Sequence, residues 1–126
     1  MAWSKYHSQK VVADGEVFDS RKEYRKYTEL CLLQKGGYIR GLQRQVPFLL
    51  IPEQREPDTI GPKGGRKRGR IIERKLEYIS DFTYEERQPD GSWAYVVEDC
   101  KGMRTREYII KRKLMLHIHG IRLRET

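Results

Sequence analysis

Two extended segments around one tight turn constrain the fold of this chain most strongly. Residues 88–92 read Gln-Pro-Asp-Gly-Ser, a composition typical of a turn. Ile71–Tyr84 precedes the turn, and Trp93–Cys100, rich in aromatic and β-branched residues, follows it. If the turn centres on residue 90, residues that face each other have numbers that sum to about 180. We therefore predict a long antiparallel hairpin with this register.

Capping signals predict one helix on each side of that hairpin in the chain. Ser20-Arg21-Lys22-Glu23 is a capping box, and Gly36-Gly37 ends the helix that it opens. Thr105 can cap a second helix, which Gly120 ends. Glu23 then lies at the N-terminal end of the apolar face of the first helix, turned towards the body of the protein.

Shorter extended segments complete the expected fold. A small hairpin turns at Asp14-Gly15, and Ile39–Ile51 reads as an edge strand or an interrupted one because it contains Pro47. Ile121–Arg124 alternates and is a candidate for a last short strand. Pro52–Arg70 is rich in glycine and proline, which predicts a mobile loop. With 126 residues, we expect a single domain over 1–126 that combines these strands with two helices.

The charge balance points to a polyanionic partner. Lys and Arg number 26 against 18 Asp and Glu, a formal net charge of +8, so nucleic acid is the first candidate. No apolar run approaches the length of a membrane span, and the start of the chain has no stretch of signal-peptide type. Cys31 and Cys100 match no zinc-ligand spacing. We therefore expect a reduced, cytoplasmic protein without a membrane partner.

The predicted hairpin gathers acidic side chains at the strand ends far from its turn. Asp81 faces Asp99, with Cβ atoms roughly 4.5–5.5 Å apart. Alternation puts Val97, Asp99 and Lys101 on one face and Glu98 with Cys100 on the other. Two close carboxylates repel each other, and a divalent cation such as Mg²⁺ or Mn²⁺ removes that conflict.

Each of these residues also has a simpler interpretation. Lys101 could orient an attacking water or neutralise developing charge, or it could form a structural ion pair with Asp81 at a sheet end. Glu23 could complete the acidic cluster or serve only its own capping box. Gln45, before Pro47, is a candidate to hydrogen-bond near the site or a plain surface residue. His117 and His119 lack a third nitrogen or sulfur ligand, so we interpret them as surface or packing residues.

Residues 79–82 (Ile-Ser-Asp-Phe) and 96–101 (Val-Val-Glu-Asp-Cys-Lys) resemble the PD-(D/E)xK motif of restriction-endonuclease-like nucleases. Asp81 matches the first aspartate, Asp99-x-Lys101 matches the second element, and Glu23 matches the early acidic residue of many members. Ser80 stands where the motif has proline. The whole chain resembles a family of small phage-encoded proteins regarded as Holliday-junction resolvases. The segments that carry this likeness are residues 5–7, 18–23, 45–48, 80–82 and 96–102.

This resemblance implies a restriction-endonuclease-like core of mixed α/β class, with a central mixed sheet flanked by two helices. It also implies a homodimer and Mg²⁺-dependent hydrolysis of DNA, with branched or four-way DNA as substrate. Its implied catalytic residues are Glu23, Asp81, Asp99 and Lys101. The metal ligands would be Glu23, Asp81, Asp99 and the Cys100 backbone carbonyl. A nuclease of another specificity (nicking, exonuclease or restriction type), a non-catalytic nucleic-acid-binding module and a structural protein remain alternatives.

Two basic segments are expected to hold the DNA backbone. The first lies in the predicted loop and supplies Lys63, Arg66, Lys67, Arg68 and Arg70. The second follows Lys101 and supplies Arg104, Arg106, Lys111, Arg112 and Lys113. The alternative for both is a merely solvated surface.

Overall fold

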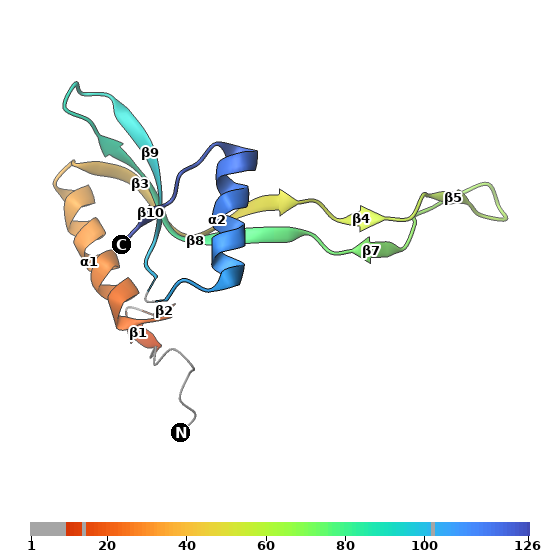
Figure 1. The fold of residues 1–126 in the computed structure, drawn as a ribbon, viewed down its shortest axis with the longest axis horizontal. Helices are drawn as coiled ribbons and strands as arrows, with labels where there is room; N and C mark the ends of the chain where they lie inside the picture. Colours follow the sequence, from red (N-terminus) through yellow and green to blue (C-terminus); the bar gives the residue numbers. More distant parts are fainter. Residues whose placement is uncertain (1–9, 14, 102) are drawn as a thin grey trace.

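A mixed four-stranded sheet with two helices forms the body of the protein. The structure is a computed structural model that describes residues 10–13, 15–101 and 103–126. The sheet has the order β10-β9-β8-β3. Its strands are β3 (Ile39–Ile51), β8 (Leu76–Arg87), β9 (Trp93–Asp99) and β10 (Arg124–Glu125), and the helices are α1 (Arg21–Lys35) and α2 (Arg106–His119). Figure 1 shows both helices beside this sheet and a narrow arm leading away from it. The expected mixed α/β class with two helices and a central mixed sheet is confirmed.

The central hairpin has the predicted register. β8 and β9 pair antiparallel from Phe82 with Glu98 to Arg87 with Trp93, so every paired set of numbers sums to 180. The Gln88 amide donates to the Ser92 carbonyl at 2.7 Å and closes the turn. The strand expected before the turn is shorter than predicted, because Arg74 and Lys75 separate β7 (Ile71–Glu73) from β8.

β3 is an edge strand, as its proline predicted. It pairs with β8 alone over nearly its whole length, and Pro47 sits opposite Ile79. A proline removes one ladder hydrogen bond, which an edge strand tolerates on its open side. The ladder has no pair at Gln45, whose φ of 53° lies in the left-handed region. Gln45 is flanked by the pairs of Arg44 with Phe82 and Val46 with Ser80, so it lies opposite Asp81.

Both predicted helix caps are confirmed. Ser20 Oγ accepts from the Glu23 amide at 3.1 Å, and Thr105 Oγ1 accepts from the Tyr108 amide at 3.1 Å. α1 ends at Gly36, and α2 ends at Gly120, whose φ of 66° suits a residue without a side chain. The small hairpin before α1 is also present, as β1 (Val11–Ala13) and β2 (Glu16–Phe18); Asp14 of its turn lies outside the described residues.

The last strand differs from its prediction. Residues 121–123 are not part of it, and the strand proper is the two-residue β10, which runs parallel to β9 through the pairs of Arg124 with Glu98 and Glu125 with Asp99. Leu123 instead packs into the core. This one parallel pair makes the sheet mixed.

The prediction of a loop over residues 52–70 holds only in part, because three two-residue strands lie within it. β4 (Gln54–Arg55) pairs with β7, and β5 (Thr59–Ile60) pairs with β6 (Arg66–Lys67), which makes an extended two-stranded hairpin. We call residues 52–75 the arm; Figure 1 shows it projecting from the body. Its strands have only two or three residues each and are separated by glycine and proline, so no alternating pattern shows in the sequence.

Side chains and close backbone contacts hold the arm together. Gly69 donates to Asp58 Oδ1 at 2.9 Å, and its carbonyl accepts from Arg55 Nη1 at 2.8 Å. The Glu56 amide donates to the Arg70 carbonyl at 2.8 Å. These contacts join residues that are more than ten positions apart in the sequence, so local sequence patterns did not reveal them.

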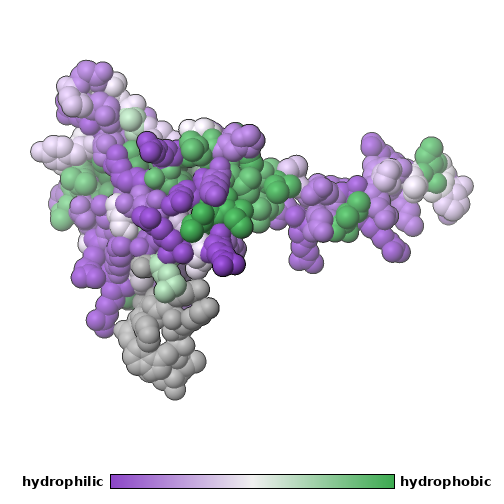
Figure 2. All heavy atoms as spheres, in the orientation of Figure 1, coloured by the Kyte–Doolittle hydropathy of each residue, from purple (hydrophilic) through white to green (hydrophobic). Residues whose placement is uncertain are grey.

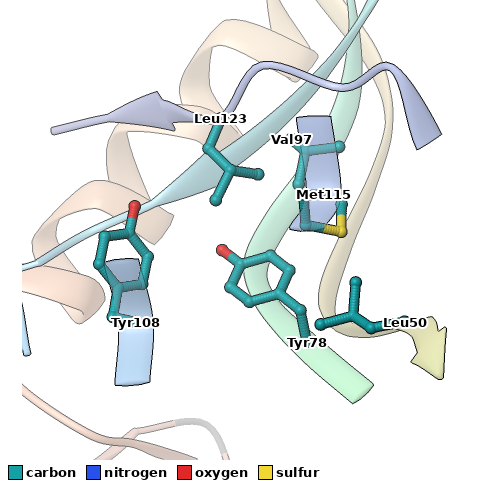
Figure 3. Close-up of a cluster of buried hydrophobic side chains, with 6 residues drawn as sticks. All are labelled: Leu50, Tyr78, Val97, Tyr108, Met115 and Leu123. Carbon is teal, nitrogen blue, oxygen red and sulfur yellow. The ribbon is translucent and has the colours of Figure 1, made fainter. Parts of the chain in front are cut away.

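Two buried clusters cover the sheet. One contains Leu50, Tyr78, Val97, Leu123 and, from α2, Tyr108 and Met115, which Figure 3 draws together. The other contains Leu30 of α1 with Ile39, Phe82, Tyr84 and Val96. Each helix therefore closes its own cluster. Among the described residues, no helix has the length and apolar character needed to cross a membrane.

Gly69→Ala should open the arm without unfolding the body. A Cβ at residue 69 would lie 1.8 Å from the Glu56 carbonyl oxygen, so the strands must separate there. We expect the amides of Glu56 and residue 69 to exchange about tenfold or more faster by hydrogen-exchange NMR, with little change in the amides of β8 and β9.

Gly65→Ala is the matched control, because a Cβ at residue 65 meets nothing within 4 Å. It should leave exchange in the arm near the unsubstituted rate. Equal exchange in all three proteins would contradict the arm geometry.

Candidate functional site

The end of the central hairpin brings Asp81, Asp99 and Lys101 together. Asp99 is the last residue of β9 and is fully buried. Asp81 Oδ2 accepts from the Cys100 amide at 2.7 Å, which fixes its carboxylate against the end of the facing strand. Lys101 Nζ lies 3.4 Å from Asp99 Oδ1. The sheet register predicted from the turn thus places these three side chains on one site.

The two oxygens of Asp99 have different surroundings. Oδ2 accepts a short hydrogen bond from the Tyr78 hydroxyl. Burial, and then this contact with Asp99, raise the pKa of Tyr78 above its usual range, so the hydroxyl keeps its proton and donates. Oδ1 is buried and accepts no hydrogen bond from the described residues. The Lys101 ammonium, 3.4 Å away, offsets part of the cost of burying this oxygen, and a bound cation would satisfy it fully.

Asp81 is held in an environment that opposes its charge. Burial is the main cause that raises the pKa of Asp81 to about 7, and the negative charge of Asp99 adds to it. The Cys100 amide and the charge of Lys101 act in the opposite direction on this pKa, whereas Glu23 raises it further. The predicted repulsion between the two aspartates is therefore present at this site.

Glu23 joins the first helix to the edge strand. Its side chain is buried, and Oε1 accepts from Gln45 Nε2 at 3.1 Å and from Arg44 Nη2 at 3.4 Å. Burial, with the nearby charge of Asp19, raises the pKa of Glu23. These hydrogen bonds show that the side chain does more than serve its capping box. They also place Gln45 beside Glu23, which agrees with the first of its two interpretations, a hydrogen bond near the site.

Three further side chains support the site. Tyr78 holds Asp99, Arg44 pairs with Glu23, and Lys22 Nζ donates to the Lys101 carbonyl at 3.3 Å. Strand alternation puts Tyr78 on the face opposite Asp81, so the sequence carried no signal for it. Strict alternation does not hold along this part of β8. Tyr78 and Phe82 should share a face, yet Tyr78 packs in the cluster closed by α2 and Phe82 in the cluster closed by α1. Lys22 could have been found from its place beside Glu23 in the first turn of α1.

Glu98 faces away from Asp99, as alternation predicted. It is fully buried, accepts from the Tyr84 hydroxyl at 2.5 Å and from Thr126 Oγ1 at 3.2 Å, and lies 3.6 Å from Lys26 Nζ. Cys100 Sγ lies on the same side, 3.9 Å from Glu98, and burial raises the pKa of this thiol to about 11. Glu98 and the protonated thiol are therefore structural groups of the other face.

The basic residues after Lys101 do not form one surface. Lys111 and Lys101 line a cleft of about 290 Å³ with Tyr78, Thr105 and Tyr108. Arg104 and Arg112 instead pair with Glu125, at 2.9 and 3.1 Å. Arg106 and Lys113 are exposed. Among the described residues of this group, Lys111 alone lines the cleft that contains Lys101, and it pairs there with Glu107 at 3.1 Å.

The basic residues of the arm lie away from the acidic cluster. Arg66 pairs with Asp58 and Arg68 with Glu53, whereas Lys63, Lys67 and Arg70 are exposed and form no ion pair with any described residue. His119 has the packing role that we expected: its Nε2 contacts the Leu49 carbonyl at 2.7 Å and its ring meets the Phe48 ring edge-on.

The acidic side chains are not arranged as a finished metal centre. In residues 10–13, 15–101 and 103–126, no group of three or more His, Cys, Asp or Glu side chains is close enough to hold a metal ion. Asp81 and Asp99 still supply hard oxygen donors of the kind that divalent cations prefer, and Asp99 Oδ1, although paired with Lys101, accepts no hydrogen bond from the described residues. Glu23 is bonded to Gln45 and Arg44 instead.

A comparison with protein families matches residues 3–124 to the family described as "Protein of unknown function (DUF1064)". The chain belongs to this family. The span matched to DUF1064 includes both helices, the arm and all four candidate catalytic residues. Neither the curated proteins nor the solved structures contain a match.

Asp81→Asn should stabilise the metal-free protein above neutral pH. The pKa of Asp81 is raised from 3.8 to about 7, so the folded state holds this proton more tightly than the unfolded chain does. The free energy of unfolding should therefore fall as pH rises from about 4 to 7. Asparagine removes the charge and keeps an acceptor for the Cys100 amide. We expect a gain on the order of 2 kcal/mol at pH 8 and much less at pH 4, measured by urea unfolding with chelator present.

Glu29→Gln, on the exposed side of α1, is the control and should show no comparable pH-dependent gain. An Asp81→Asn protein that is less stable than the unsubstituted one at pH 8 would contradict the electrostatics of the site.

Proposed function

We propose that this protein is a metal-dependent DNA endonuclease with a restriction-endonuclease-like core. The observation that carries the proposal is the convergence of Asp81, Asp99 and Lys101 at the end of one hairpin, with Asp99 Oδ1 buried and unpaired by any hydrogen bond from the described residues. A neutral core gains nothing from two adjacent carboxylates, whereas a divalent cation would stabilise both.

The proposed ligands of Mg²⁺, or of Mn²⁺ in its place, are the carboxylates of Asp81 and Asp99 and the Cys100 carbonyl. Glu23 would be the third carboxylate ligand, and its hydrogen bonds with Gln45 and Arg44 would orient it. When bound, such a cation supplies a more acidic water and stabilises charge on a phosphate group. Tyr78 has a positioning role, because its hydrogen bond to Oδ2 would fix the orientation of the Asp99 carboxylate when Oδ1 holds the cation.

Lys101 has the chemistry to assist the attack. Its ammonium group is half-buried, next to Asp99 and 5.0 Å from the centre of the Tyr108 ring. A cation held by the aspartates would compete for Asp99, leaving the lysine free to orient water or to neutralise the phosphate. Lys111, across the same cleft, would hold a phosphate of the DNA backbone.

The substrate proposed is branched DNA, above all a four-way junction, processed in the host cytoplasm during phage recombination. This choice follows the resemblance of the chain to phage resolvases. A symmetric junction needs two paired cuts, which a homodimer with two-fold symmetry would deliver. Nicking, exonuclease and restriction-type specificities use the same site chemistry, and a panel of substrates separates them.

A second candidate is a non-catalytic nucleic-acid-binding module. The ion pair between Lys101 and Asp99 favours it, because that pair partly neutralises the buried carboxylate without a metal ion. This candidate predicts binding of DNA that is independent of Mg²⁺ and of Asp99.

Asp99→Asn should abolish cleavage while leaving binding. We expect paired cuts in a labelled four-way junction in Mg²⁺ but not in Ca²⁺ or chelator, and a loss of about a hundredfold or more in cleavage rate for the variant. Junction binding in Ca²⁺, followed by fluorescence anisotropy, should change little.

Asp90→Asn, in the exposed turn far from the site, is the matched control and should cut at the unsubstituted rate. Cleavage that survives Asp99→Asn would overturn the site. Binding without cleavage in every metal would favour the non-catalytic module, and cleavage of linear duplex at an equal rate would discard the junction specificity alone.

A further inference from the structure

The arm is a narrow, basic ribbon with an apolar residue near its outer end. Residues 53–75 carry eight Lys and Arg against four Asp and Glu. Figure 2 shows mainly hydrophilic surface along the arm, with one hydrophobic patch part-way along it and another near its outer end, where Figure 1 places β5. Ile60, the last residue of β5, has 81% of its surface exposed, the largest value among the exposed large hydrophobic residues.

The outer end of the arm is narrow and carries few large side chains, so another surface can approach its backbone closely. Residues 61–65 read Gly-Pro-Lys-Gly-Gly, and the hydrogen bond from the Gly61 amide to the Gly65 carbonyl, at 2.7 Å, closes the turn. The turn carries a single long side chain, Lys63, so Ile60 and its partner Arg66 are the first side chains behind a slim tip. From Pro52 to Ile60, a strand rise of about 3.3 Å per residue gives a reach of roughly 25–30 Å.

The charge of the arm favours nucleic acid as its partner, in preference to a second copy of the chain. Lys63, Lys67, Arg70 and Arg74 are exposed and form no ion pair within the described part of the chain. Two such arms would repel each other, whereas phosphates neutralise them. A two-stranded ribbon also fits the width of a DNA groove.

On DNA, the face of a base is the apolar surface large enough to cover a side chain such as Ile60. Base faces are covered in a stacked duplex and become accessible where stacking is interrupted. Glu77, which lines the cleft that contains Lys101 and Lys111, is two residues beyond the end of the arm. The arm and this cleft are therefore neighbours along β8.

We propose that the arm is a branch-recognition element, in which its cations hold phosphates and Ile60 stacks against bases exposed at a junction. This inference rests on the proposed action on DNA and adds its physical basis for branched substrates. It makes recognition of the branch a property of the arm and separates it from the chemistry at Asp81 and Asp99.

The test uses the full-length protein in Ca²⁺ with a four-way junction that carries 2-aminopurine beside the branch point. Binding should raise 2-aminopurine fluorescence as the base loses its stacking neighbour. Ile60→Ala should abolish this rise and weaken junction binding by about tenfold, with little effect on linear duplex. Ile60→Leu should retain both signals.

Ile72→Ala is the matched control, because Ile72 is 61% exposed on the same arm but nearer its base. Equal effects of Ile60→Ala and Ile72→Ala, or none from Ile60→Ala, would overturn the proposal. A change in sedimentation mass caused by Ile60→Ala, with junction binding intact, would also overturn it by assigning the tip to contact between copies.

The outcome does not depend on catalysis. A fluorescence rise that requires Ile60, in a protein that cuts nothing in Mg²⁺, would support the arm and reject the nuclease. Cleavage that needs Asp99 but ignores Ile60 would do the reverse.

Discussion

The pairing of β8 with β9 is the constraint on which the rest of the structure depends. Its turn sets the register, and the register alone decides which carboxylates meet. Asp99 arrives beside Asp81, while Glu98, one residue earlier, is carried to the other face and satisfied by Tyr84 and Thr126. A slip of one residue would exchange these roles and leave the site face without its second aspartate.

The acidic side chains of the resulting site repel each other, and hydrogen bonds and ion pairs offset only part of this repulsion. Burial and the charge of Asp99 raise the pKa of Asp81, and the Cys100 amide and Lys101 offset only part of that effect. The helix α1 adds a further carboxylate, that of the buried Glu23, which Arg44 and Gln45 keep paired. Such an arrangement costs stability in the metal-free protein. It is the expected condition of a site whose carboxylates serve a cation, and the ion pair of Lys101 with Asp99 is the main competing contact.

Much of the fold was predictable because its signals are local. The turn at residues 88–92, the caps at Ser20 and Thr105 and the proline of β3 each act within a few residues, and all were read correctly. The arm was missed because bonds such as Gly69 to Asp58 join distant residues in a segment of glycine and proline. Tyr78 was missed because a bend in a long strand breaks the alternation that located Asp81. The proximity of the site residues followed from register, whereas their chemistry rests on resemblance.

The central claim is that Asp81 and Asp99 jointly hold one divalent cation. Anomalous diffraction from crystals grown with Mn²⁺ tests it most directly, because the signal locates the ion without reference to activity. The account predicts a peak within about 2.0–2.5 Å of oxygens from both aspartates. A peak at any other group, or no peak beside Asp99 Oδ1 at saturating Mn²⁺, would contradict it.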